Sequence, residues 1–404
     1  MLFYNDGGSI DRMHKENGMK TKLMSTAAVL MAIDSISMVH AQNSVTLYGL
    51  IDAGISYTNN VANSKGKNSS QIAFTHSTLD ADRWGMRAKE DLGGNLSAIA
   101  VLEGGFNIGN GTLSQGGREF GRQAYVGLNG KDWGTLTVGR QYDPLKDLLQ
   151  PLTADNIWGT VNVTPGDLDN YDDSLRVSNA IKYVSPDWNN LKLDAMYALG
   201  GVAGDFTAGQ TAAAALSYKF AGLAVAGGYY LAKYSPNNAA VGTSDLSDNS
   251  LANSGYAAAA RSLQIARAVA SYDINSFTIG AGYSNTRYKP ASTSGTAFTE
   301  TEAFNSLSAF ANYKFTPALT VGLNYSYTKS NGAQSAHYNQ IGAGVEYDLS
   351  KRTALYALAG YQRSAGQTLN GNMAVPATAS IGDSGYQSAS MSQIQTYIGV
   401  AHHF

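Results

Sequence analysis

Apolar and polar residues alternate along most of the chain after residue 42. In residues 318–328 the apolar face of this alternation comprises Leu319, Val321, Leu323, Tyr325 and Tyr327. Residues 277–284 and 340–347 repeat the pattern. Because successive side chains of a β-strand point to opposite faces of a sheet, a period of two predicts strands that are apolar on one face and polar on the other.

The alternation predicts a long series of strands. The candidate segments lie near 45–58, 71–79, 81–91, 95–106, 119–128, 134–142, 176–184, 190–199, 211–220, 222–233, 263–273, 276–288, 303–315, 318–328, 337–348, 352–363 and 394–404. The pattern is weakest in 71–79. If that segment is a loop, sixteen strands remain, which is an even number.

Very short turns alternate with long loops along this series. The short turns are Ala221-Gly222, Asn275-Ser276, Thr316-Pro317 and Ser350-Lys351. Each follows a strand that ends with a tyrosine two residues before its last position. The opposite connections, such as residues 235–262 and 364–393, are long and rich in Gly, Ser and Asn. Short turns at one end and long loops at the other are typical of outer-membrane barrels.

The polar face of these strands decides between two all-β architectures. In a soluble sandwich, the apolar faces meet in a core and the polar faces meet bulk water. The present strands are about ten residues long, and their apolar faces often end in Tyr or Phe, as in a lipid-facing band with aromatic girdles. A closed sheet also leaves no backbone group unpaired in hydrocarbon. We therefore predict an all-β fold, a transmembrane antiparallel β-barrel of sixteen strands around an aqueous channel.

The N-terminal region resembles an export signal. The segment starts with Met19-Lys20-Thr21-Lys22, continues with a mostly apolar stretch over 23–33, and ends with Val39-His40-Ala41. A basic start, a short apolar stretch and a small residue are the features of a signal peptide, and the stretch is too short for a membrane-spanning helix. We expect a signal peptide over 19–41, a non-native extension over 1–18, and a barrel domain over 42–404.

Composition supports this interpretation and excludes other classes. The chain has 404 residues, no cysteine, 28 Lys and Arg, and 30 Asp and Glu. Only 14% of the residues are charged, against about 25% in soluble domains. The absence of cysteine excludes disulfides and thiol chemistry. We expect no nucleic-acid partner, because the chain lacks a positive surplus.

One connection, residues 143–175, differs from the others because it shows no alternation. Leu145, Leu148, Leu149 and Leu152 have helical spacing, which predicts a short helix packed against a wall. The segment is acidic, with Asp143, Asp147, Asp155, Asp167, Asp169, Asp172 and Asp173 against one lysine, Lys146. Unstructured connections of this length are often functional.

The strands near this connection carry arginines on faces that we assign to the interior. These are Arg83, Arg87, Arg122, Arg140 and Arg176. If the acidic segment folds inward, it narrows the lumen and creates a transverse field that selects among ions. In the alternative, the segment lies outside and the arginines pair locally with Glu90, Glu103 or Glu119. We favour inward folding, because Arg83 and Arg87 share one face of one strand.

Several segments resemble a known family, the general-diffusion porins of Gram-negative outer membranes, particularly the beta-proteobacterial type. The matching segments are residues 45–52, 83–93, 121–128, 134–142, 179–186 and 399–404. They occur in order across the whole predicted barrel, although each alone would be a weak signal.

The resemblance implies a sixteen-stranded homotrimer whose third loop, here 143–175, narrows the pore. It also implies that the five arginines form the basic side of the constriction and that loop aspartates form the acidic side. The terminal Phe404 is similar to the aromatic residue that the barrel-assembly machinery recognises. A girdle aromatic at a strand end is the simpler role for Phe404, and the two roles are compatible.

Sites for other chemistry find little support in the sequence. His402 and His403 lack a third metal ligand at suitable spacing, and Asp80-Ala81-Asp82 is not followed by calcium-loop spacing. Barrel enzymes need a Ser, His and acid cluster, which the scarce histidines do not favour. We therefore expect no catalytic site, metal or cofactor. We expect a channel for passive diffusion of ions and small hydrophilic solutes, in contact with membrane lipid. The alternative is a surface adhesin or receptor that acts through the long loops.

Overall fold

The computed structural model describes residues 43–172, 174–234, 243–245, 252–291, 298–382, 384–386 and 388–404. The predicted extension over 1–18 and signal peptide over 19–41 lie outside the described residues, as does Asp173. No helix in the described part of the chain is long and apolar enough to cross a membrane.

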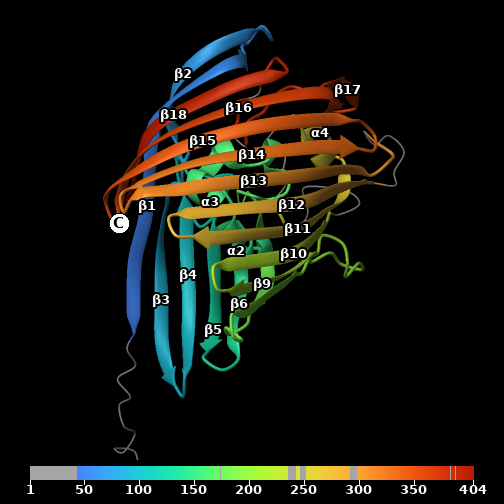
Figure 1. Ribbon diagram of the computed structural model, residues 1–404. Coiled ribbons are helices and arrows are strands. Elements are labelled where there is room, and N and C mark those ends of the chain that lie inside the picture. The colour runs from blue at the N-terminus through green and yellow to red at the C-terminus, as the bar shows by residue number, and fades with distance from the viewer. Residues whose placement is uncertain are drawn as a thin grey trace, which may run out of the picture. The chain divides into compact units, whose positions relative to one another are not determined.

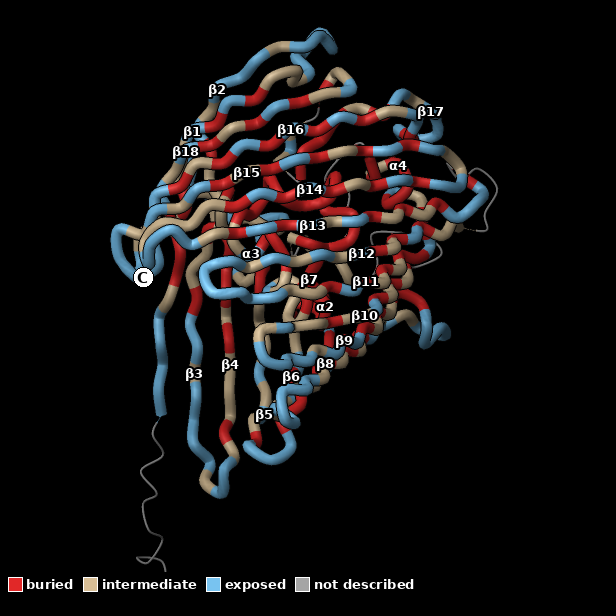
Figure 2. The backbone as a smooth tube through the Cα atoms, in the orientation of Figure 1, coloured by how far each residue is buried: buried red, intermediate tan, exposed pale blue. Residues whose placement is uncertain are grey.

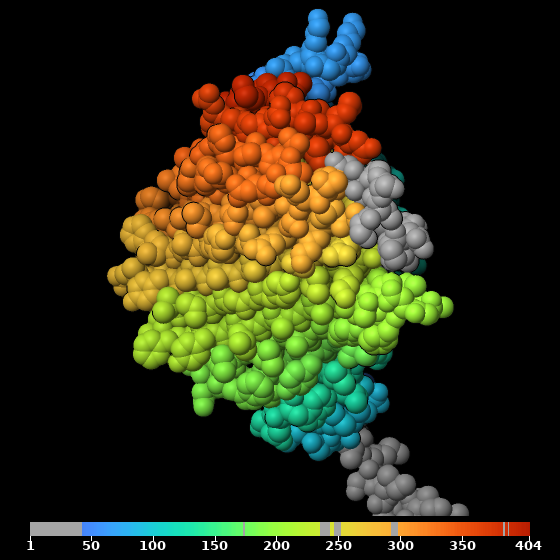
Figure 3. Space-filling model, turned by 90° about the vertical axis from the view of Figure 1, so that its right-hand side faces the viewer, coloured from blue at the N-terminus to red at the C-terminus, as the bar shows by residue number. Residues whose placement is uncertain are grey.

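Antiparallel strands dominate the structure and form one sheet (Figure 1). The strands are β1 (Ser44–Ala62), β2 (Asn68–His76), β3 (Arg83–Gly93), β4 (Leu96–Gly105), β5 (Gln123–Gly130), β6 (Gly134–Tyr142), β7 (Arg176–Val184), β8 (Leu191–Ala198), β9 (Thr211–Phe220), β10 (Leu223–Lys233), β11 (Ala260–Ile274), β12 (Phe277–Pro290), β13 (Glu302–Thr316), β14 (Leu319–Asn331), β15 (Ala336–Ser350), β16 (Thr353–Asn370), β17 (Met373–Pro376) and β18 (Ser392–His403). In Figure 3, successive bands of residues follow one another in sequence order across one face.

The sheet closes on itself, because the last strand pairs with the first. In β18, Ile398 lies opposite Ile55 of β1, and β18 pairs with β16 on its other side. The strand β1 pairs with both β2 and β3: its second half with β2, and its first half with β3. These two strands therefore occupy one position in the barrel, and β17 pairs with β16 outside the closed ring.

The closed structure is thus a sixteen-strand antiparallel barrel, which confirms the predicted fold class. The weak segment 71–79 does contain a strand, β2, but that strand shares a barrel position with β3. The sequence analysis did not predict the short strand β17.

Burial alternates along the strands as the sequence pattern predicts (Figure 2). In β14, Leu323 is 58% exposed on the outside, whereas its neighbour Asn324 is 5% exposed on the inside. Tyr325 and Ser326 repeat this contrast. An outer wall of exposed apolar side chains is stable only against lipid or another protein surface.

Two of the short turns use residues in the left-handed region. Ala221 has φ 49° between β9 and β10, and Asn275 has φ 53° between β11 and β12. A positive φ at the first turn position suits the twist of two-residue hairpins. The other two turns lie one residue later than predicted, at Pro317-Ala318 and Lys351-Arg352, because Thr316 and Ser350 still pair with the next strand.

The interior is not polar throughout, which the sequence analysis did not predict. A short helix, α4 (Ser254–Ala257), carries Tyr256 into the barrel. Its ring packs against Tyr288, Phe298 and Phe304, at centroid distances between 5.4 and 6.2 Å. The cluster fills the interior beside β10–β13. The open space therefore lies toward the other wall.

A lysine on the outer face tests the orientation of the barrel wall. Leu323→Lys places a charge midway along β14, so we expect it to cost about 2–4 kcal/mol of folding free energy in a bilayer. Leu349→Lys, at the end of β15 beside a short turn, is the matched control and should cost at most about 1 kcal/mol. Refolding titrations into lipid vesicles measure both values. Equal costs at the two positions would contradict a lipid-facing wall.

Candidate functional site

Between β6 and β7, the described residues 143–172 and 174–175 form a series of short helices inside the barrel, and we call these residues the inner loop. The described helices are α2 (Pro144–Leu148), η1 (Gln150–Leu152), α3 (Asp155–Trp158), η2 (Gly159–Asn162) and η3 (Pro165–Asp167). Figure 1 shows α2 and α3 surrounded by strands. Contacts with two opposite walls of the barrel define the path of the loop across the interior.

Asp143 starts the inner loop and caps α2. Its Oδ1 accepts hydrogen bonds from the backbone N–H groups of Leu145 and Lys146, at 2.8 and 3.4 Å. Its Oδ2 accepts from the side-chain amide of Asn170 at 2.6 Å, which joins the two ends of the loop. Complete burial raises the pKa of Asp143 to about 6, although these donors act in the opposite direction.

The first half of the inner loop packs against small residues of the wall. Leu145 and Leu149 are fully buried, as the helical spacing of the leucines predicts. Leu149 packs with Ala215, Ala226 and Val269 of β9, β10 and β11. Small residues on the inner face of these strands leave room for the helix.

Trp158 fixes the far end of the inner loop to the opposite wall. Its indole N–H donates to Asn312 Oδ1 at 2.7 Å. The ring occupies the space over two glycines of β14 and β15, and a Cβ at Gly344 would lie 2.2 Å from Trp158 Cε3. A Cβ at Gly322 would lie 2.3 Å from Trp158 Nε1. Any larger residue at these positions displaces the tryptophan.

Hydrogen bonds reinforce this contact on the same wall. The side-chain amide of Gln340 in β15 donates to the carbonyl oxygens of Val161 and Val163, at 2.8 and 3.0 Å. Gln362 of β16 in turn donates to Gln340 Oε1 at 2.6 Å. The inner loop therefore spans the interior from the wall at β9–β11 to the wall at β14–β16.

A second segment, residues 77–82, also enters the interior, where the chain leaves β2 and before it joins β3. The carboxylate of Asp52 accepts hydrogen bonds from the backbone N–H groups of Thr78, Leu79 and Asp80, at 2.8, 2.6 and 3.1 Å. Asp52 is completely buried and also accepts from the hydroxyl of Tyr356. One side chain thus satisfies three amides that have left the sheet.

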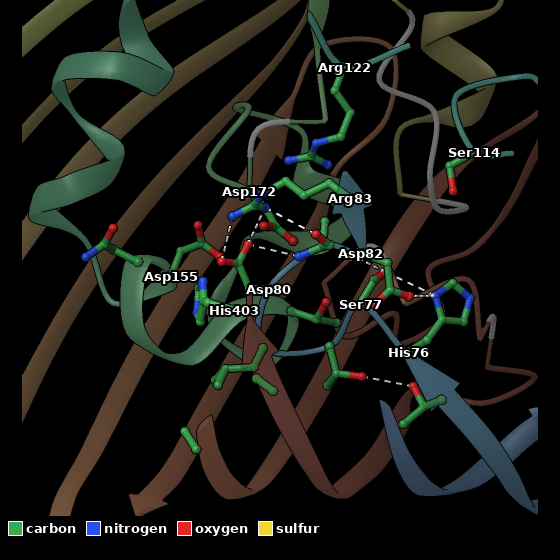
Figure 4. Close-up of a pocket in the computed structure, with 18 of the residues that line it drawn as sticks. His76, Ser77, Asp80, Asp82, Arg83, Ser114, Arg122, Asp155, Asp172 and His403 are labelled. Atoms are coloured by element: carbon green, nitrogen blue, oxygen red, sulfur yellow. Dashed lines mark hydrogen bonds and ion pairs between the residues drawn. The ribbon is translucent and has the colours of Figure 1, made fainter. Parts of the chain in front are cut away.

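The inner loop and segment 77–82 enclose one side of a cavity of about 1080 Å³ (Figure 4). The rest of the lining comes from the end of β2, from β3–β7 with the connection between β4 and β5, and from the short-turn ends of β15, β16 and β18. No residue of β8–β14 lines it, and all of these strands are described. The open path is therefore off-centre in the barrel.

Four of the five predicted arginines line this cavity: Arg83, Arg87, Arg122 and Arg176. Arg83 donates to both carboxylate oxygens of Asp80, at 2.7 and 2.9 Å, and Arg122 Nε donates to Glu103 Oε1 at 2.9 Å. Burial by itself raises the pKa of Asp80, but the charge and hydrogen bonds of Arg83 hold it below its ordinary value.

Several cations of the cavity lining also lie against aromatic rings. The guanidinium of Arg87 lies 4.1 Å from the ring centre of Tyr48. Tyr142, the last residue of β6, has Lys146, Arg176 and Arg122 at 4.7, 5.2 and 5.7 Å from its ring centre. Cations within about 6 Å of an aromatic face are attracted to it, so the ring of Tyr142 gathers three of them at the start of the inner loop.

Arg140 does not join the other four arginines at the cavity. It sits at a bulge in β6, is buried, and forms an ion pair with Asp245 at 2.6 Å. Its Nε donates to the carbonyl oxygen of Gly121 at 2.7 Å. Strict alternation in β6 would place Arg140 on the face of the exposed Leu136 and Val138, but the register shifts between Gly139 and Gln141, and Arg140 is buried beside Ser178 and Asp245.

Among the predicted acidic residues, the structure places Asp155 and Asp172 at the cavity (Figure 4). Asp143 caps α2, and Asp147 pairs with Lys182 of β7. Asp167 accepts from backbone N–H groups within the loop, and Asp169 accepts from Thr164 and Ser284. These four thus serve the fold of the loop rather than the open space.

The sequence analysis missed most of the carboxylates that line the cavity. These are Asp80, Asp82, Glu103, Glu346 and Asp348. The sequence analysis considered Glu103 only as a partner for an arginine if the acidic segment lay outside the barrel. In the structure the loop lies inside, and Arg122 nevertheless pairs with Glu103. Strand alternation would have placed Glu103 and Glu346 on the inner face.

With this geometry established, comparison with known proteins gives a clear result. A model of the Gram-negative porin family matches residues 25–367. The chain belongs to this family. Among solved structures, this porin is similar to the anion-selective porin from Comamonas acidovorans, with a TM-score of 0.67, 22% identity, and coverage of 90% of this chain and 100% of the other.

Proteins related by sequence are outer membrane proteins as well. An outer membrane porin protein of Bordetella pertussis is 47% identical over 110 residues, which cover 25% of this chain and 29% of that protein. Outer membrane porin protein 32 of Delftia acidovorans is 30% identical over 188 residues, or 45% and 50% of the two chains. This porin thus aligns with half or less of these two relatives. Major outer membrane protein P.IB of Neisseria meningitidis is 28% identical over 327 residues, or 80% and 89%.

The glycines under Trp158 provide a test of how the inner loop is held. We expect Gly344→Val to displace Trp158 and the loop, and therefore to raise the single-channel conductance of this porin in planar bilayers. Trp158→Ala should act in the same direction without adding bulk to the wall. Gly227→Val is the control, because a Cβ there meets no atom closer than 3.6 Å. Unchanged conductance in both loop variants would show that the loop does not limit the pore.

Proposed function

We propose that this porin forms a water-filled channel in the outer membrane for passive diffusion of ions and small hydrophilic solutes. The observation that carries the proposal is the cavity of about 1080 Å³, which lies between an inner loop and a charged wall inside a closed barrel. Family membership favours a channel over an adhesin and over an enzyme.

Positive and negative side chains around the open space are equal in number. Its lining contains the positive residues Arg83, Arg87, Arg122, Lys146, Arg176, Lys351 and Arg352. It contains as many negative residues, namely Asp80, Asp82, Glu103, Asp155, Asp172, Glu346 and Asp348. Selectivity therefore depends on which of these charges are neutralised by a close partner, rather than on their number.

We infer that Arg83 and Arg87 of β3, Arg122 directly before β5, and Arg176 of β7 form the basic side of the constriction. Arg83 and Arg122 are paired with carboxylates, whereas Arg87 rests on Tyr48 with its charge toward the open space. Asp155 and Asp172 of the inner loop supply the acidic side. Low-dielectric walls concentrate the field between the two sides, which favours one sign of ion over the other.

Neutralising the arginines tests this assignment. We expect Arg83→Gln, Arg87→Gln and Arg122→Gln together to shift selectivity toward cations. The shift should exceed that of Arg87→Gln alone, because loss of Arg83 and Arg122 also frees the charges of Asp80 and Glu103. The reversal potential in a tenfold salt gradient measures the shift.

The matched control replaces the same three arginines with lysine, which keeps the charge. This variant should retain the reversal potential of the original protein. If the glutamine variant also retains it, the arginines do not control ion passage.

The partners of the channel follow from its surface and its relatives. We propose a homotrimer in contact with membrane lipid. The Vibrio cholerae protein OmpT, solved in a trimer form, has a similar fold, with a TM-score of 0.60 and 16% identity. The exposed apolar outer face provides the contact area that lipid and neighbouring subunits require.

We also propose that Phe404 is the signal for the barrel-assembly machinery. Its backbone pairs with Gly49 of β1, at 3.1 and 3.0 Å, and its side chain is 43% exposed. The ring lies over Gly49, where a Cβ would be 2.2 Å from Phe404 Cζ, and its exposed part is accessible to another protein during assembly.

Phe404→Ala separates these two roles. We expect a severalfold drop in the amount of assembled barrel in cells, measured by the heat-dependent shift in gel mobility. Refolding of the same purified variant in detergent should be unchanged. An equal loss in both experiments would mean that Phe404 acts by stabilising the barrel.

A further inference from the structure

One buried residue of the wall, Asp52 of β1, makes many contacts with segment 77–82 but does not itself line the cavity. Its Oδ2 alone accepts the three hydrogen bonds from the backbone of the segment, while its Oδ1 accepts from Tyr356 of β16 at 2.6 Å. The backbone N–H of Asp52 donates to Asp82 Oδ1 at 2.7 Å, and its carbonyl oxygen accepts from the N–H of Ser77 at 3.2 Å. A single residue therefore holds the segment at both ends and in its middle.

Segment 77–82 forms part of the passage, because every residue from Ser77 to Asp82 lines the cavity. Within it, the carboxylate of Asp80 pairs with both terminal nitrogens of Arg83 (Figure 4). A two-point pair of this kind needs both groups in a defined geometry. The backbone N–H of Asp80 is one of the three groups that Asp52 holds, at 3.1 Å. The ion pair in the passage thus depends on an anchor behind it.

The segment also supports the inner loop. The backbone N–H of Thr160 donates to the carbonyl oxygen of Thr78 at 3.2 Å. The two backbones come close at Gly159, which has φ 55°, and a Cβ there would lie 2.3 Å from the carbonyl oxygen of Thr78. Leu79 packs against the apolar cluster that contains Trp158. Segment 77–82 is therefore held between β1 and the inner loop.

We propose that Asp52 is a positioning residue that sets the ion selectivity of the channel without lining the passage. The inference rests on the proposed channel function and deepens it. Asp52 fixes segment 77–82, keeps Asp80 against Arg83, and so removes one positive charge from the field across the passage. Without the carboxylate, three N–H groups of the segment turn to the water of the lumen, the segment shifts, and Arg83 presents its charge to passing ions.

A pair of substitutions, alone and combined, tests the proposal through the reversal potential in a tenfold salt gradient. We expect Asp52→Ala to shift selectivity toward anions, in the same direction as Asp80→Asn, which neutralises the partner of Arg83 and leaves the anchor in place. In a protein that already carries Asp80→Asn, Asp52→Ala should add no further shift, because both changes act through one ion pair. Two shifts that simply add would overturn the proposal.

Folding of the variants does not limit this test, since single-channel recordings report only assembled channels. Asp52→Ser, whose side chain is too short to accept from all three amides, should shift selectivity in the same direction as Asp52→Ala.

Two matched controls separate the anchor from the charge of Asp52. Asp52→Asn removes the charge but keeps an oxygen that accepts from the three N–H groups, so it should retain the reversal potential of the original protein. Tyr356→Phe removes only the hydrogen bond to the other oxygen and should retain it as well. A shift in either control as large as that of Asp52→Ala would overturn the proposal, because the charge or any lost hydrogen bond would then suffice.

A second measurement follows the segment without any ion current. The chain has no cysteine, so Ala81→Cys provides one attachment point for a nitroxide spin label within the segment. We expect restricted label motion in the original protein and with Asp52→Asn, and faster motion with Asp52→Ala. Equal motion in all three proteins would overturn the anchoring. A protein that conducts no ions but shows the expected label motions would instead overturn the proposed channel and support the anchoring by Asp52.

Discussion

Every backbone N–H and C=O group within hydrocarbon needs a hydrogen-bond partner from the protein, because the lipid offers none. This constraint explains the closed ring, in which β18 returns to β1 and leaves no free edge. It also explains how segment 77–82 is tolerated. Between β2 and β3 the chain leaves the sheet. There the carboxylate of Asp52 replaces the carbonyl groups that a neighbouring strand would supply.

Space inside the ring is the second requirement. A detour of the chain across the lumen fits only where the wall carries small residues, and Gly322 and Gly344 provide that room for Trp158. Ala215 and Ala226 do the same for Leu149. The inner loop is consequently held at both walls by packing, and hydrogen bonds from Gln340 and to Asn312 then determine its position.

The period of two allowed the barrel to be predicted from the sequence, because lipid-facing and interior residues must alternate on every strand. The arginines Arg83, Arg87, Arg122 and Arg176, which the sequence analysis assigned to the interior, line the cavity. Arg140 instead lies at a bulge and pairs with Asp245, and the inner loop has no alternation from which the roles of its aspartates could be predicted. Asp143, Asp167 and Asp169 hold groups within that loop, and only three-dimensional packing distinguishes them from Asp155 and Asp172. The sequence analysis also did not predict the apolar cluster around Tyr256, because its residues come from segments that are far apart in the sequence.

Because the cavity is off-centre, the strands of the barrel fall into two sectors with different roles. The inner wall from β8 to β14 supports the loop and the aromatic cluster and does not line the cavity. The sector from β2 to β7 lines it, while β15 and β16 both line it and hold the loop. Substitutions in the first sector that leave the loop in place therefore act through folding, while substitutions in the second also change the lining of the passage. Permeability can evolve around the arginines without disturbing the scaffold that keeps the passage open.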